Sequence, residues 1–211
     1  MEGFILKYNI NLIKNTDYTP TYWSGGMASE LITYPPSSSF ADRNFLWRLG
    51  YAKISIDTST FSNLPNIKRH LMVTSGEMTL THKDKYSKIL KPFEQDFFMG
   101  DWDTTTEGQC SVFNLMTRKN YDGILSHIKL SPKIKDFNYL YDNPNNFQLI
   151  ACCIHPLNNN IEINIDGHHF KMNKGDLLNI NLNSNNILPK INLHNTDSNN
   201  IDVIVSVIFK N

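Results

Sequence analysis

The sequence is poor in features that mark several common classes of protein. Only three cysteines occur in 211 residues, Cys110, Cys152 and Cys153, and two of them are adjacent, which does not suit a disulfide framework. Acidic and basic residues balance at 20 each, so no excess of positive charge attracts nucleic acid or an anionic membrane. We therefore expect reduced, half-buried thiols and no nucleic-acid partner.

Long apolar runs are also missing. No segment approaches the roughly 20 apolar residues that span a bilayer, and the opening segment MEGFILKYNINLIKN lacks the apolar core of a secretory signal. We therefore expect a cytoplasmic protein with no membrane partner. Hydrophobic residues make up 40% and charged residues 19%, which is enough apolar material for a folded core.

Alternation of apolar and polar residues dominates the pattern that is present. Ile161, Ile163 and Ile165 alternate with polar residues, and IDVIVSVIF near the end is rich in β-branched residues. Clusters of Gly, Pro, Asn and Asp separate such runs at intervals of roughly 8 to 15 residues, as is typical of β-sandwiches and barrels. A weak helical pattern is limited to residues 87–95. The sequence predicts an all-β fold.

Two stretches of the chain are similar to each other. HLMVTSGEMTLTH followed by FFMGDW is matched by FQLIACCIHPLNNNIEINID followed by KMNKGDLLNI. Each stretch contains an apolar strand, a turn, a second strand and a Gly-Asp turn, which indicates two similar β-modules. Any two antiparallel meanders would also look alike. We predict two β-rich halves, residues 1–130 and residues 131–211.

Several short motifs follow one another between residues 23 and 118. They are Trp23-Ser24-Gly25-Gly26, Glu30 with Tyr34-Pro35, Trp47-Arg48-Leu49, Thr60-Phe61-Ser62 with Leu64-Pro65, Arg69 ahead of Leu71-Met72-Val73, Gly76-Glu77-Met78-Thr79-Leu80, residues 98–101, and Phe113-Asn114-Leu115-Met116-Thr117. In their order and spacing these motifs resemble the HutD/Ves family of cupin-fold proteins. After about Lys129 the likeness is limited to general β character.

This resemblance implies an RmlC-like cupin architecture, a double-stranded β-helix or jelly roll with two cupin-like halves (a bicupin). It also implies an association with histidine utilisation and the binding of a small metabolite, with no assigned catalytic activity to carry over. The chain departs from the family pattern at Val112, where an acidic residue is usual, and at Met27-Ala28-Ser29, where a threonine-rich segment is usual. Roles that depend on those polar groups are not carried over.

Arginine is rare, since only four of the 20 basic residues are arginines: Arg43, Arg48, Arg69 and Arg118. Strand alternation in FLWRLGYAKISI places Arg48 on an otherwise small and apolar face with Gly50 and Ala52. An unpaired buried charge costs several kcal/mol, so Arg48 needs an anion or several hydrogen-bond acceptors. It either clamps a ligand carboxylate through two parallel hydrogen bonds or pairs internally with Glu30 or Glu77.

The other candidate residues come from the same motifs. Arg69 lies near one end of a strand, just after a turn, which places it at the mouth of a barrel. Asn114 and Met116 share one strand face and supply an amide and a flexible apolar filler. Arg118 shares that face, but it lies near the strand end and is interpreted as a solvated charge. Trp23 precedes two glycines that suit a tight loop across a pocket entrance.

These residues combine into a hypothesis of ligand binding without metal, cofactor or turnover. Arg48 and Arg69 bind a carboxylate, Asn114 orients it, Met116 fills space, and Trp23 or Trp47 closes an apolar wall. The family resemblance suggests formylglutamate or urocanate as the small anionic metabolite.

Metal and nucleophilic chemistry have little support in the sequence. The segment after Gly76 reads EMTLTH, without the His-x-His pair of metal cupins, and the adjacent His168 and His169 would point to opposite faces of a strand. Cys153 and His155 would share a strand face, but core packing explains them better. Two alternatives stay open: a cupin enzyme, either an isomerase or epimerase or a metal-dependent oxygenase, and a protein-interaction module. Pairing of two copies into a homodimer is a further expectation.

Overall fold

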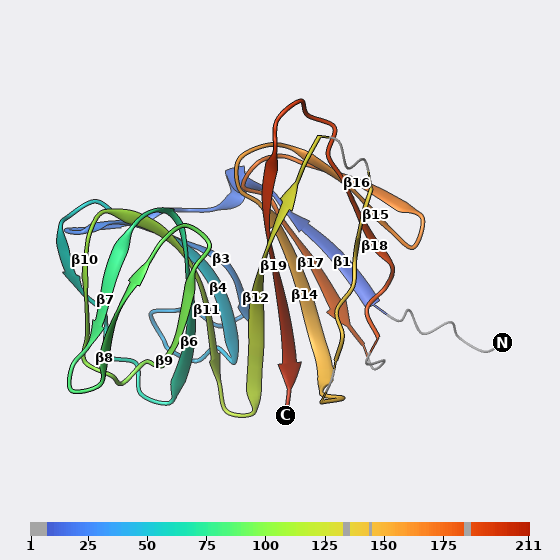
Figure 1. Ribbon diagram of the computed structural model, residues 1–211. Helices are drawn as coiled ribbons and strands as arrows, with labels where there is room; N and C mark the ends of the chain where they lie inside the picture. The colour runs from blue at the N-terminus through green and yellow to red at the C-terminus, as the bar shows by residue number, and fades with distance from the viewer. Residues whose placement is uncertain (1–7, 133–135, 144, 184–186) are drawn as a thin grey trace. The chain divides into compact units, whose positions relative to one another are not determined.

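The computed structural model describes residues 8–132, 136–143, 145–183 and 187–211, and in these residues almost all regular structure is β-strand (Figure 1). The predicted all-β fold is confirmed. The described residues include no helix with the length and apolar character needed to cross a lipid bilayer. The helix suggested by the weak pattern at residues 87–95 is not formed, because this segment contains most of β8 (Tyr86–Leu90), a turn and the start of β9 (Gln95–Met99). Pro92, which would break a helix, lies in the turn between them.

One compact unit comprises Tyr18–Asp122 and contains two antiparallel sheets. The first sheet has the order β2 (Thr21–Trp23), β3 (Gly26–Tyr34), β4 (Trp47–Ile54), β11 (Cys110–Arg118), β6 (Ile67–Gly76), β9. The second has the order β5 (Thr58–Thr60), β10 (Thr104–Glu107), β7 (Met78–His82), β8. Part of the interior is an apolar cluster that includes Leu71, Val73, Leu80 and Val112.

The other compact unit comprises the described residues of segments 1–17 and 123–211, and it also contains two antiparallel sheets. The first has the order β1 (Tyr8–Ile13), β17 (Leu177–Leu182), β14 (Gln148–Pro156), β19 (Ile201–Lys210), β12 (Tyr121–Leu130). The second has the order β13 (Phe137–Tyr139), β18 (Ile191–His194), β15 (Ile161–Ile165), β16 (His168–Met172). Its core consists mainly of aliphatic side chains.

The two units share one strand topology. Adding eight to each strand number converts the order β4-β11-β6-β9 into β12-β19-β14-β17, and β5-β10-β7-β8 into β13-β18-β15-β16. The predicted pair of similar halves is therefore confirmed.

The turns before β9 and β17 repeat the same hydrogen bonds. Glu94 N–H donates to the Lys91 carbonyl at 2.9 Å and its carboxylate accepts from Lys91 N–H at 2.9 Å. Asp176 and Asn173 do the same at 3.0 and 2.9 Å. The Gly-Asp turns compared in the sequence are not equivalent, because Gly100-Asp101 follows β9 whereas Asp176 precedes β17.

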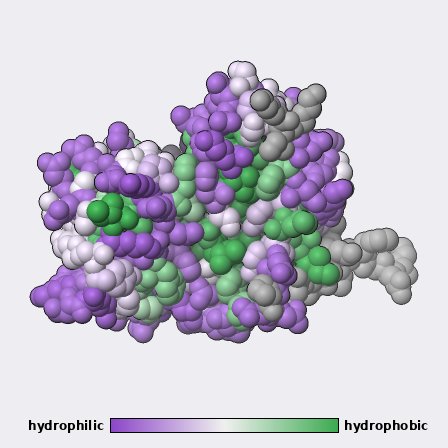
Figure 2. All heavy atoms as spheres, viewed as in Figure 1, coloured by the Kyte–Doolittle hydropathy of each residue, from purple (hydrophilic) through white to green (hydrophobic). Residues whose placement is uncertain are grey.

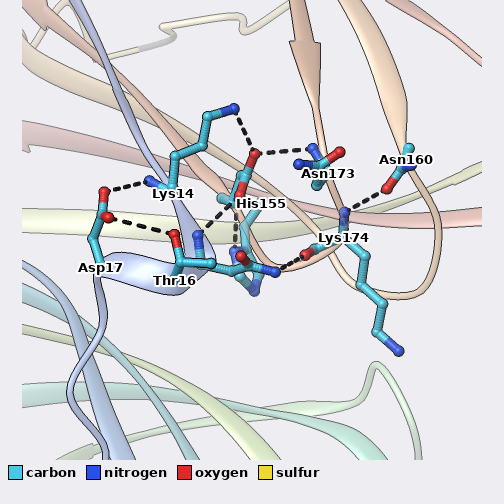
Figure 3. Close-up of polar contacts among 9 residues, drawn as sticks. Lys14, Thr16, Asp17, His155, Asn160, Asn173 and Lys174 are labelled. Carbon is cyan, nitrogen blue, oxygen red and sulfur yellow. Dashed lines mark hydrogen bonds and ion pairs between the residues drawn. The ribbon is translucent and has the colours of Figure 1, made fainter.

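Strand β1 pairs along its length with β17, from Tyr8 opposite Leu182 to Ile13 opposite Leu177. The buried carboxylate of Asp176 secures its end, because it accepts hydrogen bonds from Lys14 Nζ at 3.1 Å and Asn15 N–H at 2.9 Å (Figure 3). The predicted division into residues 1–130 and 131–211 assigns this segment to the first half. The division of the chain into these two domains stays a prediction.

Candidate functional site

The unit Tyr18–Asp122 contains a cavity of about 720 Å³. Its floor comes from the middle of the sheet, on strands β3, β4, β6 and β11, and its rim comes from β2, β5 and the segments that follow β3 and β5. The lining combines charged, amide and hydroxyl groups with aromatic and small apolar side chains: Glu30, Arg48, Arg69, Asn114, Thr19, Thr21, Ser39, Ser59, Thr60, Ser62, Trp23, Tyr51, Phe40, Phe61, Ala28, Ala41, Ala52, Gly50, Leu64 and Met116.

Strand register explains why the floor residues meet. Met116 on β11 lies opposite Arg48 on β4 and opposite Arg69 on β6, so these three form one row across the sheet. In the next row Asn114 lies opposite Gly50 and Leu71. Directly opposed residues project from the same face. The alternation predicted from the sequence thus brings Arg48, Arg69, Asn114 and Met116 into a single cavity.

Arg48 is 8% exposed and is held from two sides. Its Nε donates to Glu30 Oε2 at 2.8 Å, and its guanidinium carbon lies 4.8 Å from the centre of the Phe40 ring. A Cβ on Gly50 would come within 2.6 Å of Arg48 Nη1, so the guanidinium fits because position 50 is a glycine. The internal pair with Glu30, one of the expected alternatives, is formed. Exposed Glu77 is not its partner.

Arg69 is 6% exposed and forms no ion pair with any described residue. Its guanidinium carbon lies 4.6 Å from the centre of the Phe61 ring and 5.2 Å from that of Phe98, and its buried Nε has no hydrogen-bond partner in the described part of the chain. Burial, together with the nearby charge of Arg48, lowers the pKa of Arg69 to about 9. The buried cation thus lacks an anion.

Asn114 provides an acceptor beside the two guanidinium groups. The residue is 8% exposed, and its Oδ1 is buried without a hydrogen-bond partner among the residues that the structure describes. A buried amide oxygen of this kind is unfavourable unless a donor reaches it. The floor of the cavity therefore offers donors from Arg48 and Arg69 and one free acceptor from Asn114.

The two tryptophans predicted for the site lie in different places. Trp23 lines the cavity at its rim, is 41% exposed and packs its ring over Gly25, where a Cβ would lie only 1.8 Å from Trp23 Cζ3. Trp47 does not line the cavity. It is fully buried and stacks on Tyr34 with 5.8 Å between ring centres. Trp47 precedes Arg48 on the strand, so alternation directs it to the opposite face.

Three further residues belong to the site. Phe40 and Phe61 place aromatic rings against Arg48 and Arg69, and Glu30 anchors Arg48. Phe61 was visible only as the centre of a family motif, and nothing in the sequence pattern marks Phe40. Arg118 lies outside the cavity, where its Nη1 donates to the carbonyl of Arg43.

The other unit shows what the corresponding strand positions look like without Arg69 and Asn114. Phe93 N–H donates to the Val73 carbonyl, and Gly175 N–H donates to the Pro156 carbonyl in the equivalent turn of the other unit. Val73 and Pro156 are therefore equivalent positions, and they align the strands of the two units. In that alignment Arg69 corresponds to Cys152. Met116, which lies opposite Arg69, corresponds to Val207, which lies opposite Cys152. By the same register Asn114 corresponds to Val205, which lies opposite Ile154. The fold therefore does not require an arginine or an asparagine at these positions.

The cysteines are free, as expected, but they are buried rather than half-buried. Burial raises the pKa of Cys152 to about 12 and that of Cys110 to about 11, and the Cys153 thiol donates to Asn179 Oδ1 at 3.3 Å. Burial also lowers the pKa of His155 to about 4. Among the described residues, no group of three or more His, Cys, Asp or Glu side chains could hold a metal ion.

Solved structures with a similar fold include three informative cases. A conserved protein of unknown function from Pseudomonas aeruginosa PAO1 has a TM-score of 0.80 and 17% identity, over 96% of this chain and 100% of that one. HutD from Pseudomonas fluorescens SBW25 has a TM-score of 0.70 and 19% identity, over 96% and 100%. A variant of Bacillus subtilis oxalate decarboxylase has a TM-score of 0.63 and 7% identity, over 95% and 77%.

HutD and oxalate decarboxylase are bicupins, so the predicted cupin-like architecture with two halves is confirmed. At these identities the likeness concerns the fold. The HutD family model matches residues 15–192 of the 211, and the chain therefore belongs to the HutD family.

Proposed function

We propose that the cavity binds a small carboxylate and that the protein acts through this binding, without a metal and without turning the ligand over. The observation that carries the proposal is Arg69, a buried guanidinium with no acidic partner in the described chain, next to a second guanidinium. A carboxylate between Arg48 and Arg69 would supply the missing anion through charge-assisted hydrogen bonds.

The rest of the cavity supports a ligand with an uncharged body. Glu30 already offsets one of the two positive charges, which leaves the floor with a surplus of one. Asn114 Oδ1 would accept a hydrogen bond from an N–H or O–H group of the ligand, and Phe40, Phe61 and Trp23 supply apolar walls.

Family membership suggests which acids to test first. HutD from Pseudomonas fluorescens SBW25 has been solved in a formate condition, and formate is the smallest carboxylate that could occupy such a site. By the same analogy we propose a regulatory role in histidine utilisation, with urocanate or formylglutamate as ligand. The cytoplasmic location and the homodimer expected from the sequence stay predictions.

The test is calorimetry and thermal shift with formate, urocanate and formylglutamate. We expect at least one acid to stabilise the protein, and we expect the effect to disappear in Arg48→Ala and in Arg69→Met. Lys53→Met, which removes an exposed cation from β4 outside the cavity, is the matched control and should bind normally. Formamide, the uncharged counterpart of formate, should have no effect.

Two results would count against the proposal. The first is the absence of stabilisation by any member of a broad panel of organic acids. The second is binding that survives in Arg69→Met, because the unpaired guanidinium would then have no part in recognition.

A further inference from the structure

A second polar site lies on the outer face of the sheet β13-β18-β15-β16. One polar residue from each of its four strands forms a row across the sheet. Asn138 lies opposite Asn192, Asn192 lies opposite Asn164, and Asn164 lies opposite His169. The residues next to them on β15 and β18, among them Ile163 and Ile191, project to the opposite face and are fully buried in the core. A continuous row of three amides and an imidazole therefore faces outward.

Asparagine is depleted in β-strands, so such a row is not explained by strand propensity. The row has amides at three successive positions across the sheet. In the view of Figure 2 the surface over β15 and β16 is mostly hydrophilic.

The row forms the floor of a shallow pocket of about 380 Å³. Asp136, Lys190 and His194 complete the lining, and no apolar side chain takes part in it. Asp136 and Lys190 supply one charge of each sign, and the Asp136 carboxylate contacts His194 Nδ1, so the lining has no strong field of either sign. A ligand that depends on apolar burial or on a high charge would gain little here.

Hydrogen bonds fix the orientation of one end of the row. Gly167 N–H donates to Asn164 Oδ1 at 2.9 Å, which identifies that atom as oxygen and leaves Nδ2 to donate to His169 Nε2 at 3.0 Å. Because His169 Nε2 accepts, the hydrogen of the neutral ring is on Nδ1. Asn164 and His169 therefore form a preset edge of the pocket.

The centre of the row has unused hydrogen-bonding capacity. The side-chain amides of Asn138 and Asn192 lie opposite each other and form no hydrogen bond with the described residues. Each amide offers two donors and one acceptor. Two adjacent amides can thus donate to and accept from a pair of neighbouring hydroxyl groups, which are themselves both donors and acceptors.

We infer that this pocket binds a neutral polyhydroxylated ligand, a sugar or a polyol, with Asn138 and Asn192 as its principal contacts. The balanced charge, the absence of apolar residues from the lining and the paired free amides all match vicinal hydroxyl groups. This site is separate from the carboxylate cavity, which is lined by residues of the unit Tyr18–Asp122. The two proposals therefore stand or fall independently.

The experiment is an NMR titration of the full chain with glucose, galactose, mannose and glycerol to tens of millimolar, following the side-chain amide signals of Asn138 and Asn192. We expect at least one compound to give saturating shifts of both signals. Tetrahydropyran, a sugar ring without hydroxyl groups, should give none. Asn192→Ala should weaken binding about tenfold or more, as followed through the Asn138 signal, because a ligand hydroxyl would lose its amide partner.

Lys171→Ala is the matched control, since Lys171 lies on the same strand as His169, is highly exposed and does not line the pocket. It should bind as the unmodified protein does, and far-ultraviolet circular dichroism should show that all variants are folded. Two outcomes would overturn the inference: no saturating shift with any neutral compound in the unmodified protein, or an unchanged titration of the Asn138 signal in Asn192→Ala.

Discussion

Replacing Arg69 by methionine should stabilise the ligand-free protein, although core substitutions usually destabilise. Lowering an arginine pKa from 12.5 to about 9 corresponds to a penalty of about 5 kcal/mol for holding the charged form in the folded chain. The rings of Phe61 and Phe98 offset about 0.5–2 kcal/mol each. A net gain of about 1–4 kcal/mol is therefore expected when a flexible apolar side chain of similar length replaces the cation.

The sign of this effect depends on pH. Below a pH of about 9 both the folded and the unfolded chain carry the Arg69 charge, so the penalty is fully present at neutral pH. It is relieved only as the pH rises above about 9, where the folded chain releases the proton before the unfolded chain does. The comparison should therefore be made near pH 7.

The assay is denaturant and thermal unfolding of the unmodified protein, Arg69→Met and the control Lys53→Met. The gain corresponds to about 2–4 °C in Tm for each kcal/mol, and the control should lie within about 0.5 kcal/mol of the unmodified protein. A carboxylate ligand at 100 times its Kd should stabilise the unmodified protein by about 2.7 kcal/mol and the variant not at all. A loss of more than about 1 kcal/mol in ligand-free Arg69→Met would refute the reasoning, because Arg69 would then be structurally satisfied.

Three further predictions concern other residues. Gly50→Ala should weaken carboxylate binding about tenfold or more in calorimetry, because the new Cβ displaces the Arg48 guanidinium; unchanged affinity would contradict this. The free energy of unfolding should fall by about 3 kcal/mol between pH 6.5 and 4, because the unfolded chain protonates His155 before the folded chain does, and His155→Gln should reduce this slope; equal slopes would show that other groups cause it. Cys152 should resist iodoacetamide at pH 8 in the native protein, since its pKa is raised to about 12, and mass spectrometry showing rapid native alkylation would contradict its burial.

The sequence was informative where strand periodicity governs. The alternation that places Arg48, Gly50 and Ala52 on one face is a local property of a strand, and the structure retains it. The same rule separates Trp47 from Arg48, so the inclusion of Trp47 among the site residues conflicted with the alternation itself. The helical pattern at residues 87–95 failed because Pro92 and the turn at Lys91 and Glu94 override a short apolar period.

Contacts between distant segments were beyond the sequence. Phe40 reaches Arg48 from an irregular segment, and its backbone N–H donates to Glu30 Oε2 at 3.2 Å, so its place depends on a loop conformation that no periodicity encodes. The free amides of Asn138 and Asn192 depend on the register of β13 against β18. Pairing of this kind becomes visible only when the strands have been placed.

The attachment of β1 to β17 has a consequence for biosynthesis. Segment Tyr18–Asp122 has all its sheet partners within itself and can fold as soon as it leaves the ribosome. Strand β1 is made earlier still, yet its partner β17 emerges more than 160 residues later, and so does the Asp176 carboxylate that receives Lys14. Strand β1 is thus translated before the segment Tyr18–Asp122 but paired only after β17 has been made, and during that interval its backbone is open to pairing with the wrong neighbour.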